Sequence, residues 1–367
     1  MKLSFDRVAL TDAFGLVAGV APSRTTKEIL KNVKVATTGG GNITLVATDG
    51  EIGIRCEVAG SCDAVGVALI PSLKVMAILK ELKGETVTLA FNDRSVKIKC
   101  GQSNFTLQSE DPSDFPDVAT WDSDESHAIA ADVLRTMIQR TVFCTDEDST
   151  RYALAGIQIG VEPGATVLAS TDSRRLAVAS FGNRISDKPT EAVVPAKAMQ
   201  VLFRSLVNVS GDAEIAIRPN DAMFRFGGIT IVTQLTQGRF PNYRKVIPEN
   251  PAVKIDLLVG PLLSAVRQSM IVTNEESRGV DFTFEPGWLK LNSQATDIGQ
   301  SKIEVPIAYD GDAITITFDP RYIADFLRVV DPTDMITFGV TNADNSSLMT
   351  FGDNYKYVVM PLARAVS

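Results

Sequence analysis

The chain has 367 residues, of which 45% are hydrophobic and 22% are charged, and its formal net charge is −8 at pH 7. This composition is typical of a soluble globular protein, and the length suits two or three domains better than one core. Because the chain is acidic overall, it is not a generally basic nucleic-acid binder, and any surface for a polyanion must be local.

Several kinds of site and signal are missing from the sequence. No apolar run approaches the roughly 20 residues of a membrane span, and the start MKLSFDRVAL has an acid where a signal peptide would be apolar. We therefore predict a cytoplasmic protein that does not bind membranes. Cys56, Cys62, Cys100 and Cys144 form no CxxC pair and have no neighbouring histidine, which predicts reduced, buried thiols and neither a metal nor a cofactor.

One pattern of apolar residues recurs three times along the chain. Each copy begins with a helix whose apolar positions are spaced i, i+3, i+4, i+7, starting at Leu10, Leu134 and Leu262. A second helix repeats this spacing from Val75, Met199 and Ile323. A proline stands three or four residues before each second helix's first apolar position, as is common near a helix start. The six predicted helices are 7–19, 72–83, 131–142, 196–206, 260–272 and 319–329.

Strands are predicted for the rest of each copy. Alternating sequence with polar turns indicates hairpins at Thr86–Phe91 with Ser95–Cys100, Glu214–Arg218 with Met223–Phe226, and Met335–Val340 with Ser347–Phe351. Gly39-Gly40-Gly41-Asn42 predicts another hairpin turn, because glycine supplies positive φ. Thr48-Asp49 of the first copy is matched by Thr171-Asp172 of the second. We predict an α+β fold of three repeated domains, at 1–119, 127–248 and 252–367.

Basic residues recur on the predicted outer side of the second helices. Lys80, Arg204 and Arg328 stand five positions after the first apolar residue, which is about 150° from the apolar stripe. Lys197 and Arg321 lie on the same outward side. The six predicted helices carry 11 basic and 5 acidic residues, although helix propensity would favour Glu as much as Lys. We infer a basic helical surface that could meet a phosphate backbone.

These features occur together with stretches that resemble a known family. The stretches are Thr171-Asp172-Ser173-Arg174-Arg175-Leu176-Ala177, the segment Gly238–Pro251, Arg151-Tyr152 with Leu154 and Gly156, Asn274-Glu275 with Arg278-Gly279-Val280, and the ending Tyr357–Pro361. The whole chain resembles the bacterial DNA sliding clamp, the beta subunit of DNA polymerase III. The resemblance implies three domains of the clamp fold and a head-to-tail dimer closed into a ring, with helices lining the hole and β-sheets outside.

Helix spacing gives an independent check on the size of such a ring. Six helices about 10 Å apart leave a hole only about 9 Å wide, whereas twelve leave one of about 28 Å. The groove depths alone make a DNA duplex more than about 16 Å across. Two chains are therefore needed to encircle it.

The resemblance also implies a function and a set of partners. It implies a processivity factor, not an enzyme, that encircles duplex DNA without sequence specificity and tethers the replicative polymerase through a hydrophobic peptide-binding groove. The implied partners are double-stranded DNA, the DNA polymerase III alpha subunit, the clamp loader, other replication and repair proteins that carry clamp-binding peptides, and a second copy of the chain.

Three sets of residues follow from the resemblance and the repeat. The DNA-binding set comprises Arg24, Lys80, Lys197, Arg204 and Arg328. The dimer interface is expected to join Lys74 and Phe105 at one end of the chain to Ile271 and Val272 at the other. The groove is expected to be formed by Leu154, Thr171, Arg175, Leu176, Pro241, Val246, Ser347, Val358, Met360, Pro361 and Leu362. Ser173-Arg174 depart from the Gly-His that is usual in relatives.

Other interpretations stay open at this point. An enzyme could use Glu275-Glu276 or Asp146-Glu147-Asp148 as an acid/base pair, but charges in exposed loops are far more common. His127 is the only histidine, which leaves no His-based triad and no HExxH motif. A three-domain adaptor that never meets DNA would not need a recurrent basic helix face. The apolar interface and groove residues could also be ordinary core residues.

Overall fold

The computed structural model describes residues 1–38, 41–92, 94–123, 125–146, 148, 152–182, 189–274 and 277–362. The chain forms two compact units. The first unit is Met1–Arg135 with Lys197–Leu235, and the second is Thr136–Ala196 with Thr236–Ser367. The division passes through α3 (Ala131–Gln139) and the start of α4 (Ala196–Ser205).

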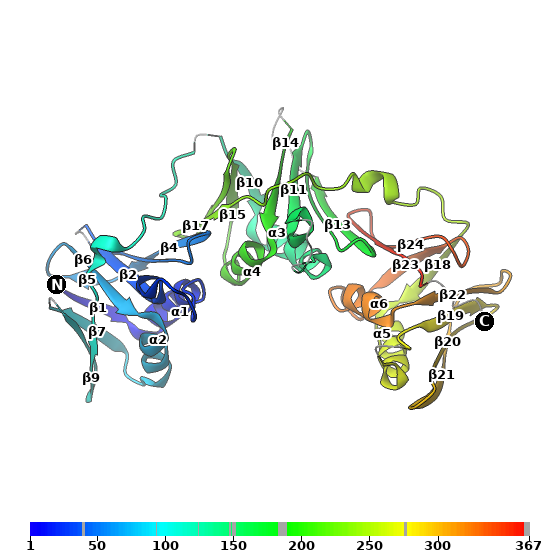
Figure 1. Cartoon of the computed structure of the whole chain (residues 1–367), viewed down its shortest axis with the longest axis horizontal. Helices are drawn as coiled ribbons and strands as arrows, with labels where there is room; N and C mark the ends of the chain where they lie inside the picture. Colours follow the sequence, from blue (N-terminus) through cyan, green and yellow to red (C-terminus); the bar gives the residue numbers. More distant parts are fainter. Residues whose placement is uncertain are drawn as a thin grey trace. The chain divides into compact units, whose positions relative to one another are not determined.

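The first unit contains two antiparallel sheets (Figure 1). The five-stranded sheet has the order β5 (Ser61–Cys62), β1 (Lys2–Asp6), β7 (Thr86–Phe91), β8 (Ser95–Cys100), β9 (Ser103–Gln108). The eight-stranded sheet has the order β10 (His127–Ala130), β15 (Asp212–Ile217), β16 (Asp221–Phe226), β17 (Ile229–Gln234), β4 (Ile52–Ala59), β3 (Asn42–Thr48), β2 (Asn32–Thr37), β6 (Gly66–Pro71). Because β17 pairs with β4, this sheet contains strands from the first two sequence copies.

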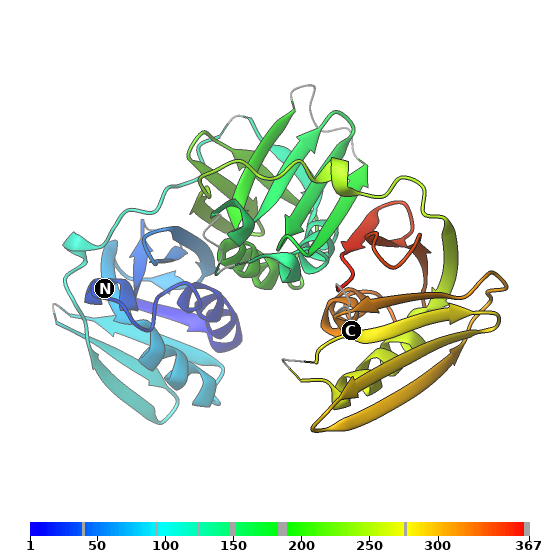
Figure 2. The same ribbon diagram turned by 45° about the vertical axis from the view of Figure 1, so that its right-hand side comes forward.

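Two helices of the first unit, α1 (Arg7–Ala18) and α2 (Ser72–Glu81), lie side by side (Figures 1 and 2). The Asp6 carboxylate caps α1 by accepting a hydrogen bond from the Ala9 N–H at 2.8 Å. Leu10, Phe14 and Val17 of α1 are buried in the predicted stripe. The unit also has 3-10 turns at η1 (Glu28–Lys31) and η2 (Pro112–Asp114).

The second unit also contains two antiparallel sheets. Its eight-stranded sheet has the order β14 (Thr190–Pro195), β11 (Gly156–Glu162), β12 (Ala165–Thr171), β13 (Arg175–Gly182), β25 (Tyr355–Val359), β24 (Ser347–Phe351), β23 (Met335–Val340), β18 (Val253–Leu258). Its four-stranded sheet has the order β21 (Gly299–Pro306), β20 (Trp288–Ala295), β19 (Val280–Glu285), β22 (Ile314–Phe318). The pairing of β13 with β25 brings Leu176 opposite Val358 and joins strands of the second and third sequence copies.

Helices α5 (Val259–Ser269) and α6 (Pro320–Leu327) of the second unit lie side by side. Asp319 caps α6, and Pro320 occupies its first turn, where the missing N–H has no cost. Phe326 of α6 stacks on Tyr355 and Tyr357, with ring centroids 5.1 Å apart in both pairs. The 3-10 turns of this unit are η3 (Val142–Cys144), η4 (Tyr152–Ala155), η5 (Tyr243–Val246) and η6 (Met270–Val272).

The repeat is visible in a five-residue turn that occurs once in each unit. In both copies the Thr hydroxyl donates to the carbonyl four residues on, and the Asp carboxylate accepts from the N–H groups two and three residues on. The third turn residue has positive φ, which is +100° at Gly50 but +72° at Ser173, where a side chain makes this conformation less favourable. The predicted match between Thr48-Asp49 and Thr171-Asp172 is therefore confirmed.

The secondary-structure predictions are largely confirmed. All six helices are present, but 260–272 is an α-helix only to Ser269 and then tightens into η6. The hairpins β7–β8 and β23–β24 have the predicted bounds. In the glycine turn, residues 39–40 lie outside the described residues, whereas the strands on either side pair antiparallel as expected. The domain boundaries stay a prediction.

One of the four cysteines differs from the prediction. Cys56, Cys100 and Cys144 are buried free thiols, but Cys62 is only half-buried, because it lies in the short edge strand β5. Burial raises the pKa of Cys56 to about 11, so this thiol stays protonated near neutral pH.

Candidate functional site

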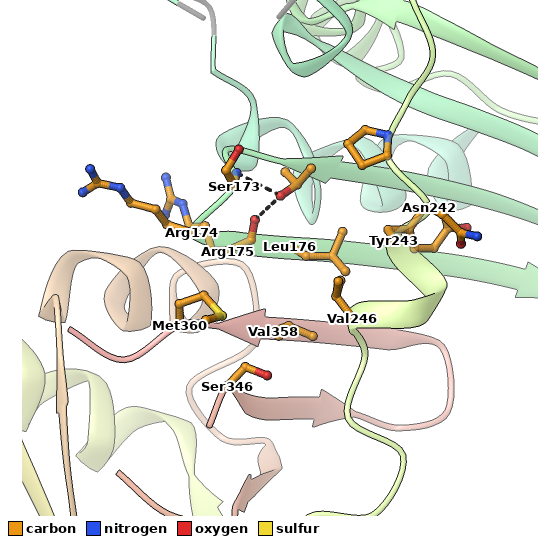
Figure 3. Close-up of a pocket in the computed structure, with 12 residues that line it drawn as sticks. Ser173, Arg174, Arg175, Leu176, Asn242, Tyr243, Val246, Ser346, Val358 and Met360 are labelled. Carbon is orange, nitrogen blue, oxygen red and sulfur yellow. Dashed lines mark hydrogen bonds between the residues drawn. The ribbon is translucent and has the colours of Figure 1, made fainter. Parts of the chain in front are cut away.

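The second unit has a mainly apolar pocket of about 450 Å³ at the edge where β13 and β25 pair (Figure 3). One wall comes from the turn before β13 and from the strand itself, a second from β25 and the residue after it, and a third from the segment around η5. The lining residues are Thr171, Ser173, Arg174, Arg175, Leu176, Pro241, Asn242, Tyr243, Val246, Ser346, Val358 and Met360.

The third wall is held in place by two aromatic anchors. Phe240 and Tyr243 are buried against the sheet in a cluster with Leu176 and Val358, and their rings meet edge to face at 6.2 Å. Between the anchors, Pro241 fixes the local backbone and accepts a hydrogen bond from the Tyr243 N–H at 2.7 Å. Val246, at the end of η5, is then left 56% exposed on the pocket wall.

Arg175 ties the first wall of the pocket to η3 and to helix α6. Its Nε donates to Asp172 Oδ2 at 2.9 Å, one terminal nitrogen donates to Asp325 Oδ2 at 2.7 Å, and the other donates to the Phe143 carbonyl at 2.8 Å. The guanidinium also lies 4.5 Å from the centroid of the Tyr322 ring. The Arg175 side chain is only 10% exposed, so its charge is compensated by the two carboxylates and fixes the pocket's geometry.

Seven of the predicted groove residues line this pocket, namely Thr171, Arg175, Leu176, Pro241, Val246, Val358 and Met360. Leu154, Ser347, Pro361 and Leu362 lie outside its wall. Leu154 is a buried residue of η4. Ser347, the first residue of β24, is fully buried, and the preceding Ser346 lines the pocket instead. Sequence reasoning missed Tyr243, Asn242, Ser346 and the turn residues Ser173 and Arg174 as lining residues. Period-two alternation shows only that Ser346 and Ser347 face opposite sides of the chain, so no sequence signal identified Ser346 as the lining residue.

The predicted DNA-binding residues are all exposed, but their charges differ in availability. Lys197 forms an ion pair with Asp49, and Arg328 donates to Asp325 Oδ1 at 2.7 Å. Burial alone would raise the pKa of Asp49, but hydrogen bonds from Lys197, Ile52 and Glu51 lower it below its usual value, which keeps this pair ionised. Lys80 and Arg204 have no carboxylate partner within the described part of the chain.

The predicted interface residues lie at exposed positions in each unit. In the first unit Lys74 is exposed on α2, and Phe105 is 38% exposed on the edge strand β9. In the second unit Ile271 is 75% exposed on η6 beside a hollow of about 380 Å³, and Val272 is half-buried. Core packing therefore does not account for Phe105 and Ile271.

The described residues contain neither a membrane-spanning helix nor a cluster of metal-ligating side chains. No helix among them is both long and apolar enough to cross a membrane. Across the described ranges, His, Cys, Asp and Glu form no group of three or more that could hold a metal ion. Of the carboxylates considered for acid/base chemistry, Glu275-Glu276 and Glu147 lie outside the described residues.

Comparisons with known proteins cover nearly the whole chain. Models of the DNA polymerase III beta subunit match as its N-terminal domain at residues 1–119, its central domain at 128–242 and its C-terminal domain at 244–363. The beta sliding clamp of Pseudomonas aeruginosa is 30% identical over 370 residues, covering 99% of this chain and all of the relative. That of Chlamydia pneumoniae is 26% identical over 364 residues, 99% of each chain.

A solved structure extends the likeness to three dimensions. The crystal structure of a Pseudomonas aeruginosa sliding clamp bound to griselimycin has a TM-score of 0.93 and 29% identity, and covers 99% of this chain and 100% of that one.

Proposed function

Because the chain belongs to the family of DNA polymerase III beta subunits, the bacterial sliding clamps, we propose that two copies close into a ring around duplex DNA and tether the replicative polymerase to it. The chain has the three-domain clamp fold of this family, whose members are processivity factors and not enzymes. We propose that it acts in the cytoplasm, where bacterial DNA is replicated.

The observation that carries the tethering role is the apolar pocket at the junction of β13, β25 and η5. A peptide that extends from a partner can insert a Leu or Phe side chain there and bury it against Leu176, Val358 and Met360. Met360 suits several different peptides because its unbranched side chain adapts to irregular shapes. We propose the polymerase alpha subunit, the clamp loader and repair proteins as partners of this pocket.

The test of the pocket is a matched pair of methionine substitutions. Met360→Ala should weaken the binding of a labelled clamp-binding peptide from the polymerase alpha subunit by about tenfold, since truncating an apolar contact of a binding pocket costs about 1–2 kcal/mol. Met335→Ala is the control, because Met335 is 58% exposed on β23 of the same sheet and does not line the pocket. Fluorescence anisotropy measures both. Equal affinity of the two variants would contradict a peptide site here.

Ring closure is proposed to use sheet edges as well as apolar side chains. Strands β9 and β21 each stand at the end of a sheet, with one edge lacking a strand partner among the described residues. Exposed edges of this length favour pairing with another chain. We propose that β9 of one protomer meets β21 of the other and that Phe105 fills the hollow beside Ile271. Because the contact joins different surfaces, two copies of it close a two-fold ring.

For DNA we propose that Lys80 and Arg204 contribute more than Lys197 and Arg328, whose charges are compensated by carboxylates. The pair Lys80→Glu and Arg204→Glu should lower affinity for duplex DNA whatever its sequence. The slope of log affinity against log salt should also become less steep, by about one for each phosphate group that the variant no longer neutralises. Lys97→Glu is the control, because Lys97 is an exposed lysine on strand β8 and does not belong to the helical surface. If Lys97→Glu reduces the salt slope as much as Lys80→Glu and Arg204→Glu do, the assignment of DNA binding to the helical surface is wrong.

A further inference from the structure

Arg174 is the one pocket-lining cation whose charge is not compensated by a carboxylate among the described residues. Its side chain is exposed, and no ring of the described chain stacks on it. The neighbouring Arg175 differs, since Asp172 and Asp325 both accept hydrogen bonds from its guanidinium. The pocket wall therefore combines an apolar surface with a single available positive charge.

The backbone of Arg174 is fixed on both sides. Its N–H donates to Asp172 Oδ1 at 3.0 Å, within the repeated turn. Its carbonyl accepts from the Met360 N–H at 2.9 Å, which joins the turn to the residue after β25. Only the side chain of Arg174 is then left to be ordered when a ligand binds, which lowers the entropy cost of binding.

The charge lies at one end of the pocket. Figure 3 shows Ser173, Arg174 and Met360 at the end opposite Tyr243 and Val246. An apolar peptide side chain between Leu176 and Val358 would therefore have Arg174 to one side of it and the η5 wall to the other. A ligand group facing Arg174 must sit next to the apolar anchor.

We propose, building on the peptide site proposed above, that Arg174 makes this pocket select peptides with an acidic side chain next to their apolar anchor residue. A guanidinium presents parallel N–H donors that match a carboxylate, and a charge-assisted pair of this kind is stronger than a neutral hydrogen bond. The pair lies at the pocket rim, so its contribution is modest and screened by salt. Selectivity thus comes from the charge, and the bulk of the affinity from the apolar walls.

The experiment uses three peptides with the same apolar core and amidated C-termini, carrying Asp, Asn or Lys beside the anchor residue. At low salt the full-length protein should bind the Asp peptide about two- to fivefold more tightly than the Asn peptide, and the difference should fade as salt rises. Arg174→Gln should bind the two equally, and Arg174→Glu should prefer the Lys peptide. The control Arg94→Gln removes an exposed arginine of the first unit outside the pocket and should keep the preference for Asp.

Failure of this proposal is distinguishable from failure of the peptide site. If the Asn peptide binds and depends on Met360, but the unchanged protein does not discriminate Asp from Asn, the role of Arg174 is wrong and the site stands. If none of the peptides depends on Met360, the site itself is wrong.

Discussion

Protein loaded by a clamp loader onto nicked circular plasmid should elute with the plasmid in gel filtration, and should elute free once the plasmid is cut at a single site. A ring on a closed circle has no free end to leave from, whereas a linear duplex lets it slide off. The expected change is from nearly complete retention to nearly complete loss. Gel filtration of labelled protein before and after cutting measures it.

Salt provides the control for this experiment. Binding through phosphate contacts weakens steeply with salt because counterions are released, whereas encirclement does not depend on those contacts. Retention on the circle should therefore survive a wash of about 0.5 M salt that strips protein held only by charge. Equal retention on circular and linear DNA would exclude a ring. Loss from both at high salt would indicate surface binding.

The three-fold repeat could be predicted from the sequence because helices leave a strong periodic signal. Apolar residues at i, i+3, i+4 and i+7 mark a helix face without knowledge of its partners, and the stripe of Leu10, Phe14 and Val17 is buried as that spacing predicts. The paired turns at Thr48-Asp49 and Thr171-Asp172 were predictable for a similar reason, because their hydrogen bonds are local.

The pocket could be predicted only in part, because its walls are distant in sequence. The resemblance to the family identified Leu176, Val246 and Met360. The local sequence pattern, however, cannot show which of two neighbouring residues faces the pocket unless the register of the strand is known. Ser346 and Ser347 were confused for this reason.

The sequence also could not predict which basic side chains are paired with carboxylates. Helical register correctly placed Lys197 and Arg328 on exposed surfaces, but it gives no information about their partners. Asp49 lies 148 residues from Lys197, and Asp325 is shared between Arg328 and Arg175, which is 150 residues away. Counting the basic residues on the helix faces therefore overestimates the positive charge that is available to DNA.

The dimer is expected to dissociate far more readily when Ile271 and Val272 are both replaced by alanine. Ile271 is 75% exposed, and the hollow beside it offers about 380 Å³ for a partner's side chain. Truncating an aliphatic anchor of an interface costs about 2 kcal/mol or more. A closed two-fold ring has this contact twice, so the dissociation constant should rise roughly a thousandfold. Sedimentation velocity over a dilution series measures the change.

The partner of Ile271 can be identified with a double-mutant cycle. If Phe105 of the other protomer fills the hollow, Phe105→Ala and Ile271→Ala remove the same contact, so the double variant should dissociate less readily than the sum of the two single effects predicts. Val65→Ala is the control, because Val65 is 68% exposed in the first unit and belongs to neither surface. It should leave the dimer unchanged. Strictly additive effects would show that Phe105 and Ile271 take part in separate contacts. If the Ile271→Ala, Val272→Ala variant is still fully dimeric at nanomolar concentration, η6 is not part of the interface.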